Sequence, residues 1–342
     1  MNTRLYRLLS LGLIAACAKE PRAKEGTADT TQLAPIVTSL PVSRLGSGMS
    51  ERINWIFSPD RTAVLVVADR VGVEAEPLPN GFVFGDERTG FQLQMDSVWD
   101  VAASPDWKSI AFSKAYIVTD GAGRIDPANL SDLARRTSID TATLRSSSFS
   151  ISGMSEARAI AQPGVVHIPV APRSTTAGDS AAPRMFPVAR GWRVRWTSDG
   201  AIIALGNAPT RALDAEPSES WSALDPRTGD FHGSLPAAAR IVEPSMFAGP
   251  VIHGSMGADL SAAPPIKVVR GGRELTIVSE RGVITVTATT PGDSSAASPH
   301  VIGVGVALAA TAGGGYVIAI APRTKVQAGE SPVEAVVYRV SW

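Results

Sequence analysis

Few side chains in this sequence have the type and spacing that catalysis or metal binding requires. The single cysteine, Cys17, excludes an internal disulfide and any cysteine-rich zinc or iron–sulfur site. The four histidines share no His-x-x-x-His spacing, so we expect no metal site and no cofactor. Residues 253–257 (HGSMG) approach the Gly-x-Ser-x-Gly nucleophile elbow, but histidine replaces the first glycine, and we interpret them as a loop between strands. The sequence therefore names no catalytic residue.

The residues before Cys17 form a short export-type segment. Residues 1–16 carry Arg4 and Arg7 near their start, contain no acidic residue and continue into the apolar run Leu8–Ala16, which is too short to span a bilayer. The segment Ile14-Ala15-Ala16-Cys17 resembles the lipobox of bacterial lipoproteins. The resemblance implies a signal peptide of residues 1–16, a mature N-terminus at an acylated Cys17, and stable attachment to a lipid bilayer. An ordinary secretory signal cut after Ala18 is the alternative.

The residues after the cysteine predict a tether and then one folded body. Ala18 stands where, by the enterobacterial rule, aspartate would signal inner-membrane retention, so the resemblance implies the outer membrane, facing the periplasm or the cell surface. Residues 17–34 are small, polar and charged, and we expect a lipidated cysteine and a flexible tether. Residues 35–342 then form a single domain. Since Lys+Arg and Asp+Glu both number 32, no basic field indicates nucleic acid as a partner.

One uncharged stretch, Val301–Pro322, has the length of a membrane helix. Glycines interrupt it at 303, 305 and 313–315, and β-branched residues cluster on either side. We therefore expect two buried strands joined by a glycine turn.

Two turn motifs recur with a period near 46 residues. The first is Phe57-Ser58-Pro59-Asp60-Arg61, repeated at Ala103–Trp107 and Trp196–Gly200, and its aspartates lie 46 and 93 residues apart. The second is Asp86-Glu87-Arg88-Thr89-Gly90, repeated 139 residues later at Asp225–Gly229. Two independent motifs on one period predict a repeat architecture.

The aspartates of these motifs have the chemistry of turn residues. Proline presets φ for a tight turn, aspartate caps free backbone N–H groups, and the final glycine tolerates a positive φ. An acid that recurs at the equivalent place in several repeats is more simply explained by a role in stabilising the fold than by one unique site. We therefore predict structural, not catalytic, roles for a set of five aspartates: Asp60, Asp86, Asp106, Asp199 and Asp225.

The first motif resembles the repeats of TolB-type and WD-repeat-like β-propellers, which read x-Trp-Ser-Pro-Asp-Gly-Lys-x-Ile-Ala-Phe. The match is best in Ile53–Val67 and Val98–Ser113 and fair in Arg193–Leu205. At the position of the motif's glycine this chain instead has Arg61 and Trp107 in its first two copies. The resemblance implies an all-β propeller of four-stranded antiparallel blades.

The period sets the expected number of blades. Motif positions near residues 58, 104, 152, 198, 244 and 311 give six blades, with seven as the alternative. The position near 244 is a degenerate copy, Val242–Ser245. The terminal runs Pro35–Leu40 and Ala335–Trp342 read as strands, and we expect them to complete one blade and close the ring.

Insertions interrupt the repeat. We expect a helix within residues 126–136, where Asp126 and Pro127 form a start signal. Low-complexity loops are expected at three places: Arg173–Pro187, Thr210–Ser220 and Thr289–Pro299.

Two functions fit these features. The first is a lipid-anchored, monomeric, non-enzymatic scaffold of the cell envelope that displays its loops to a protein or polymer. The second is a propeller enzyme, a hydrolase or lyase acting on an envelope or imported polymer in its central funnel. Because a funnel site draws on several blades, it leaves no linear motif, and converging carboxylates or histidines would favour the enzyme.

Overall fold

The computed structural model describes residues 34–43, 49–71, 80–117, 161–169, 184–187, 193–206, 221–254, 262–289 and 298–342. Within these ranges the chain forms twenty-one strands and no helix, and all strand pairs are antiparallel. The predicted all-β antiparallel class is confirmed. No helix of the described ranges has the length and apolar character to cross a membrane. The Cys17 segment and the helix expected within 126–136 lie outside these ranges.

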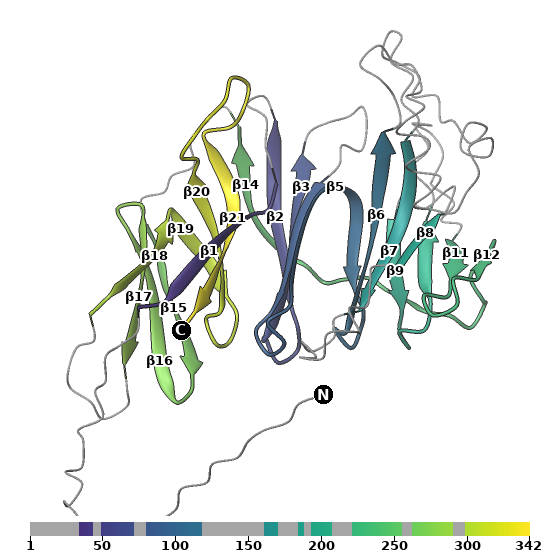
Figure 1. The fold of residues 1–342 in the computed structure, drawn as a ribbon, viewed down its shortest axis with the longest axis horizontal. Helices are drawn as coiled ribbons and strands as arrows, with labels where there is room; N and C mark the ends of the chain where they lie inside the picture. Colours follow the sequence, from purple (N-terminus) through teal and green to yellow (C-terminus); the bar gives the residue numbers. More distant parts are fainter. Residues whose placement is uncertain are drawn as a thin grey trace, which may run out of the picture. The chain divides into compact units, whose positions relative to one another are not determined.

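The largest sheet has eight strands in the order β14-β2-β3-β4-β5-β6-β7-β8 (Figure 1). Its strands are β2 (Ser50–Phe57), β3 (Ala63–Val71), β4 (Asn80–Asp86), β5 (Gln92–Ala103), β6 (Ser109–Ile117), β7 (Ala161–Pro169), β8 (Arg184–Pro187) and β14 (Phe247–His253). The long β5 belongs to two meanders, because Leu93 pairs with β4 and Val101 pairs with β6, with a register shift between Val98 and Asp100. The sheet therefore joins β2–β5 to β5–β8.

Three smaller sheets account for the remaining strands. The order β12-β11-β10-β9-β13 uses β9 (Arg193–Thr197), β10 (Ile203–Gly206), β11 (Trp221–Leu224), β12 (Phe231–His232) and β13 (Ile241–Val242). The order β15-β16-β17-β18 uses β15 (Ala262–Arg270), β16 (Arg273–Glu280), β17 (Val283–Thr289) and β18 (His300–Val304). The order β1-β21-β20-β19 uses β1 (Ile36–Pro41), β19 (Val306–Ala310), β20 (Tyr316–Pro322) and β21 (Val333–Ser341).

The first and last strands of Pro35–Trp342, which forms one compact unit, pair with each other. Their register runs from Ile36 opposite Ser341 to Pro41 opposite Val336. The predicted pairing of the two terminal runs in one sheet is thus observed.

The uncharged stretch 301–322 is β-structure, as expected. Strands β19 and β20 form a hairpin, and Gly314 in the connecting turn has a φ of 68°. The stretch also contains most of β18, which belongs to the neighbouring sheet.

Two details of the expected repeat differ from the structure. The degenerate copy at Val242–Ser245 is not a turn between paired strands, because β13 pairs with β9 while the following β14 pairs with β2. The expected loop Arg173–Pro187 ends in a strand, β8, that pairs with β7. In both places the strand is too short, or too poor in apolar alternation, to show a period of its own.

Strand β3 is buried on both faces. Val64 packs in an apolar cluster with Ile318 of β20, whereas Leu65, on the opposite face, packs with Ile110 of β6. Side chains of successive strand residues point to opposite faces, so a run of apolar residues without alternation fits a strand between two layers. The apolar run after the first turn motif therefore lies between two neighbouring meanders.

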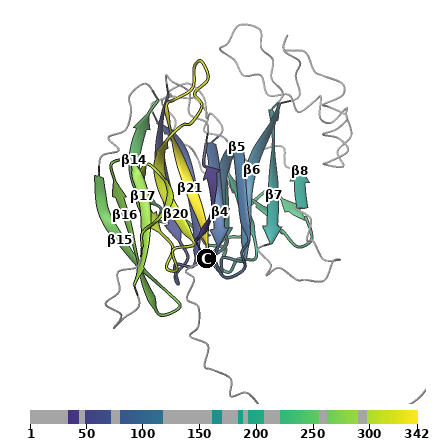
Figure 2. The ribbon, with the colours of Figure 1, turned by 60° about the vertical axis from the view of Figure 1, so that its left-hand side comes forward.

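The other meanders also share cores with their neighbours. Ile277 of β16 packs in one cluster with Val336 of β21, and these two sheets lie side by side in both views (Figure 1, Figure 2). Ala111 of β6 packs in another cluster with Ile203 of β10. Within the described residues these neighbouring groups of strands thus bury faces against each other in four apolar clusters.

Candidate functional site

Four turns of the structure share one set of backbone hydrogen bonds. Each begins with a hydroxyl residue whose N–H donates to the carbonyl five residues on and whose carbonyl accepts from the N–H three residues on. The hydroxyl oxygen also accepts from the N–H five residues on. The four initial residues are Ser58, Ser104, Thr197 and Thr311. The repeat read from the sequence is therefore a repeat of hydrogen bonds.

Three of the predicted aspartates lie two residues into these turns. Asp60 Oδ1 accepts from the Ser58 hydroxyl at 2.6 Å and from the Thr62 N–H at 3.2 Å. Asp106 and Asp199 accept from the corresponding groups of their own turns. The hydrogen bond from Ser58 lowers the pKa of Asp60 to about 2.

The other two turn carboxylates are held ionised in the same way. The hydrogen bond from Thr197 lowers the pKa of Asp199. Burial raises the pKa of Asp106, but hydrogen bonds from Ser104 and the Lys108 N–H outweigh it, and the net change is downward.

Asp86 and Asp225 occupy equivalent places in the second motif. Asp86 Oδ1 accepts from the Arg88 N–H at 2.8 Å, and Asp225 Oδ1 accepts from the Arg227 N–H at 2.7 Å. The glycine that ends each motif has a positive φ. Asp86 is buried while Asp225 is half-buried. The structure thus places all five aspartates in turns, and Arg88 joins two of these turns, because its Nη1 lies 3.7 Å from Asp60 Oδ2 and its Nε lies 3.7 Å from Asp86 Oδ1.

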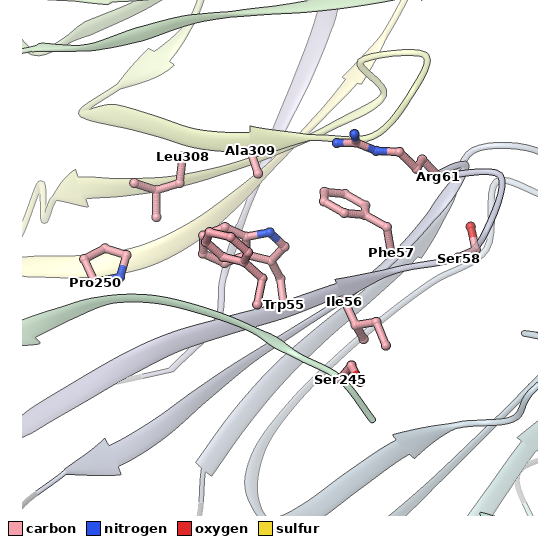
Figure 3. Close-up of a pocket in the computed structure, with 10 residues that line it drawn as sticks. Trp55, Ile56, Phe57, Ser58, Arg61, Ser245, Pro250, Leu308 and Ala309 are labelled. Carbon is pink, nitrogen blue, oxygen red and sulfur yellow. The ribbon is translucent and has the colours of Figure 1, made fainter. Parts of the chain in front are cut away.

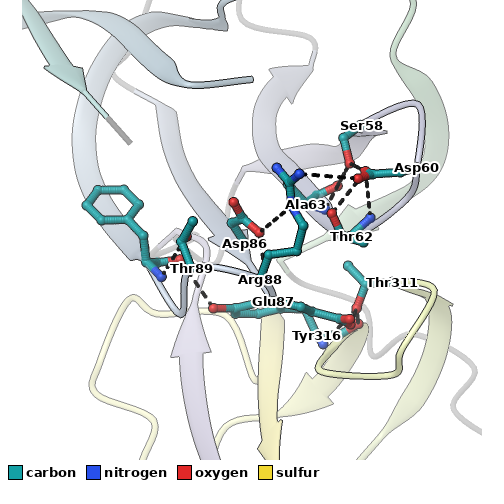
Figure 4. Close-up of polar contacts among 11 residues, drawn as sticks. Ser58, Asp60, Thr62, Ala63, Asp86, Glu87, Arg88, Thr89, Thr311 and Tyr316 are labelled. Carbon is teal, nitrogen blue, oxygen red and sulfur yellow. Dashed lines mark hydrogen bonds and ion pairs between the residues drawn. The ribbon is translucent and has the colours of Figure 1, made fainter. Parts of the chain in front are cut away.

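The turn at Thr311 has Gly313 where the other three have aspartate, and a carboxylate from elsewhere in the chain takes the place of the missing one. Glu87, which follows β4, accepts hydrogen bonds at Oε1 from the Thr311 hydroxyl and, at 2.7 Å, from the Gly315 N–H (Figure 4). These groups match the two that bind Asp60 in the first turn. A Cβ at Gly313 would collide with Glu87 Oε2, so the glycine makes room for the borrowed group.

Two further backbone hydrogen bonds join these turns, the first of them across the two sheets. The Ala312 N–H donates to the Arg61 carbonyl at 2.8 Å, and the Glu87 N–H donates to the Thr62 carbonyl at 2.9 Å. The first and last meanders are therefore fixed to each other at this end of the strands.

The fourth position of each turn has a left-handed backbone. Its φ is 57° at Arg61, 60° at Trp107, 68° at Gly200 and 68° at Gly314. This conformation costs a non-glycine residue roughly 1 kcal/mol. Trp107 offsets the cost by packing in the core beside Phe84. Arg61 is exposed, and its guanidinium lies 4.8 Å from the centre of the Phe57 ring.

Beside Arg61 is an apolar cleft of about 780 Å³ (Figure 3). Its walls come from β2, β14 and β19 and from the turn between β2 and β3. Ten residues line it: Trp55, Ile56, Phe57, Ser58, Arg61, Ser245, Phe247, Pro250, Leu308 and Ala309. A volume of this size is typical of ligand pockets.

Two aromatic rings, tilted by 31° to each other, dominate the cleft. The rings of Trp55 and Phe247 lie 4.7 Å apart between centroids. Trp55 is buried, whereas Phe247 is 62% exposed. Among the ten described lining residues Arg61 is the one cation, and none is acidic.

A second polar cluster lies between β5 and β9. Asp100 Oδ2 accepts from Arg195 Nη1 at 2.6 Å and from the Val194 N–H at 3.0 Å, while Arg195 Nε donates to Glu243 at 2.8 Å. Burial raises the pKa of Asp100, although the Arg195 charge opposes it. Burial also raises the pKa of Asp69, against a hydrogen bond from Asn54 and the charges of Arg52 and Arg195. Asp69 and Asp100 thus both have raised pKa values, and the charge of Arg195 acts on both carboxylates.

Sequence reasoning missed both of these sites. Arg61 carried a usable signal, because an arginine at a position that prefers glycine suggests that its side chain is needed there. Asp100, Arg195 and Asp69 come from three strands and share no motif. Among the described residues no group of His, Cys, Asp and Glu has the arrangement of a metal site.

Comparisons with known proteins give a limited result. No family model and no curated protein matches the sequence. The β-propeller domain of the Trilobed protease from Pyrococcus furiosus is 9% identical over 90% of this chain and 70% of that chain, with a TM-score of 0.25. Pyrococcus horikoshii acylaminoacyl peptidase is 11% identical over 80% of this chain but only 36% of its own, with a TM-score of 0.25. Zg3597, a family 117 glycoside hydrolase from Zobellia galactanivorans, is 8% identical over 90% and 91%, with a TM-score of 0.24. Likenesses at this level assign neither a family nor an activity to this chain.

Proposed function

We propose that this chain is a lipid-anchored β-propeller of the cell envelope that binds a partner through the cleft lined by Trp55 and Phe247. Four-stranded meanders that bury faces against one another are what a propeller requires. Five such groups lie in the described residues: β2–β5, β5–β8, β9–β12, β15–β18, and β19–β21 with β1. We propose six blades, with seven as the alternative, and ring closure through the sheet that β1 and β21 share.

The anchor is proposed from the sequence alone. Cys17 is acylated and is the first mature residue, and the body faces the periplasm or the cell surface as a monomer. Intact-mass analysis of detergent-extracted protein should show an acylated N-terminus at Cys17. A mature chain that begins at Lys19 would disprove the anchor.

The exposed Phe247 ring is the observation that carries the binding function. A large ring that is 62% exposed above a buried indole adds apolar area to the surface, which stabilises the protein little unless a partner covers it. The five turn aspartates are occupied in backbone hydrogen bonds, so we propose that they hold the strands rather than carry out chemistry.

Site-specific crosslinking tests this function. A photoreactive residue at Phe247 should crosslink one envelope component in cells, and Phe247→Ser should abolish binding of that component to the purified protein. Val301 is the matched control, since it is 63% exposed on β18, away from the cleft. Equal crosslinking at both positions would contradict a binding site at the cleft.

A second function, a hydrolase or lyase, is favoured by Asp69, Asp100 and Arg195. Perturbed carboxylates beside one cation are typical of active sites, although structural ion pairs share this property. Cleavage of an envelope polysaccharide that Asp100→Asn abolishes, with the melting temperature unchanged and Asp225→Asn active, would place the function there instead.

A further inference from the structure

We infer that the cleft binds the C-terminal end of a partner polypeptide, with an apolar side chain over Trp55 and Phe247 and the free α-carboxylate at Arg61. This inference rests on the proposed binding function and states the chemistry of the partner.

The lining is complementary to an apolar group that ends in an anion. Apolar side chains form most of the walls, and the guanidinium of Arg61 stands at one end (Figure 3). Among the described residues Arg61 has no ion pair, and its guanidinium makes one hydrogen bond, a long one of 3.4 Å to the Ala310 carbonyl. Since a guanidinium carries five N–H donors, Arg61 retains donors for a carboxylate. The nearby Asp60 is occupied by its own turn and lies 3.7 Å from Arg88.

Two edge strands make a polypeptide the fitting occupant. Within the described residues β14 and β19 are edge strands of their sheets, and both line the cleft. An edge strand leaves a row of backbone N–H and C=O groups unpaired, which an extended peptide can bind by adding a strand. A fatty acid would satisfy the apolar walls and Arg61 but would leave these backbone groups in water.

The backbone at Arg61 supports a functional reason for the arginine. The equivalent residues Gly200 and Gly314 hold the same left-handed conformation without a side chain. Core packing offsets the strain at Trp107, whereas Arg61 is exposed and its guanidinium contacts only the Phe57 ring and, at 3.4 Å, the Ala310 carbonyl among the described residues. A strained position that keeps a cation at the mouth of an apolar cleft is explained by a ligand that needs the cation.

Fluorescence anisotropy with two labelled peptides tests the inference. Both have the sequence Gly-Ser-Val-Phe-Leu; one ends in a free carboxylate and the other in an amide. The free acid should bind the wild-type protein about tenfold or more tightly than the amide, the scale of a hydrogen-bonded charge pair. Arg61→Gly should weaken the free acid to the level of the amide, while Arg61→Lys should keep part of the preference.

The variant Arg281→Gly is the matched control. Arg281 is an exposed arginine with a φ of 52° in the turn between β16 and β17, outside the cleft. Because glycine relieves the backbone at both positions, both variants should melt at or above the wild-type temperature. Arg281→Gly should leave the preference for the free acid unchanged.

Three other results distinguish failure of this inference from failure of the proposed binding function. If acid and amide bind equally and both are lost in Phe247→Ser, the cleft is a binding site but the anionic terminus is wrong. If neither peptide binds while dodecanoate does, and only in the presence of Arg61, the polypeptide is wrong. If Phe247→Ser changes neither peptide nor partner binding, both this inference and the proposed function are overturned.

Discussion

Glu87 supplies the turn at Thr311 with the carboxylate that this turn lacks. The acid comes from the loop after β4, and the turn that receives it joins β19 to β20 in a different sheet. In the turns of Ser58, Ser104 and Thr197 the same contacts are made within five residues. A local contact has thus become one that links the first meander to the last.

Because of this link, we expect two substitutions that each destabilise the protein to compensate for each other when combined. Glu87→Ala should lower the free energy of unfolding by about 2 kcal/mol, because it removes charge-assisted hydrogen bonds. Gly313→Asp alone should also destabilise, since its Cβ would collide with Glu87. Together they should recover about 1 kcal/mol or more, because the introduced carboxylate would restore the usual local arrangement. Urea unfolding of the four proteins measures this coupling, and simple additivity of the two losses would contradict it.

Acid should weaken the first turn within a defined pH range. The folded pKa of Asp60, about 2, lies below its ordinary value of 3.8, so its contribution to stability is complete above pH 3.8 and is lost as the pH falls to about 2. Asp60→Asn should therefore lower the melting temperature at pH 7 and make little difference at pH 2. An equal loss at both pH values would show that charge plays no part.

Asp106→Ala, in the second turn, should lower the free energy of unfolding by about 1 kcal/mol and leave partner binding intact.

Alkali should destabilise the core through Tyr316. Burial raises its pKa from 10.0 to about 12, so the folded state holds the proton that the unfolded state gives up. Stability is then complete below pH 10 and falls as the pH rises towards about 12. Tyr316→Phe should reduce this alkaline loss, as seen in melting temperatures between about pH 9 and 12. The same slope in both proteins would assign the loss to other groups.

Removal of β21 should unfold the body. This strand pairs with β1 on one side and β20 on the other, and its residues Val336, Val337 and Val340 are buried. Deletion of Ala335–Trp342 should therefore give aggregation or loss of the cooperative transition. Deletion of Trp342 alone, which is 38% exposed and follows the strand, should have little effect. A monomeric eight-residue deletion with the wild-type melting temperature, measured by light scattering and calorimetry, would refute the argument.

The strands could be predicted from the sequence because the residues that form their turns lie next to one another in the chain. Ser-Pro-Asp and Asp-x-Arg-Thr-Gly mark where the chain reverses, and the apolar run after Asp60 predicts the buried β3. The pairing of β13 with β9 and of β14 with β2 could not be predicted from the sequence, because tertiary packing determines which of these strands are neighbours. The same holds for Glu87, whose partner lies in a distant turn, and for Asp100 with Arg195. Arg61 lies between these cases, since its position is local but its purpose depends on β14 and β19.

The pairing of β1 with β21 also bears on the order of events during synthesis. Strand β1 precedes every other described strand in the sequence and its partner β21 follows them all, so this sheet is complete only after β21 has been synthesised. Pairing across such a sequence separation makes folding slow, since the long loop must close before the contact is gained. This pairing, rather than the hairpins that join strands adjacent in sequence, is therefore expected to limit the rate at which the sheet of β1, β19, β20 and β21 is completed.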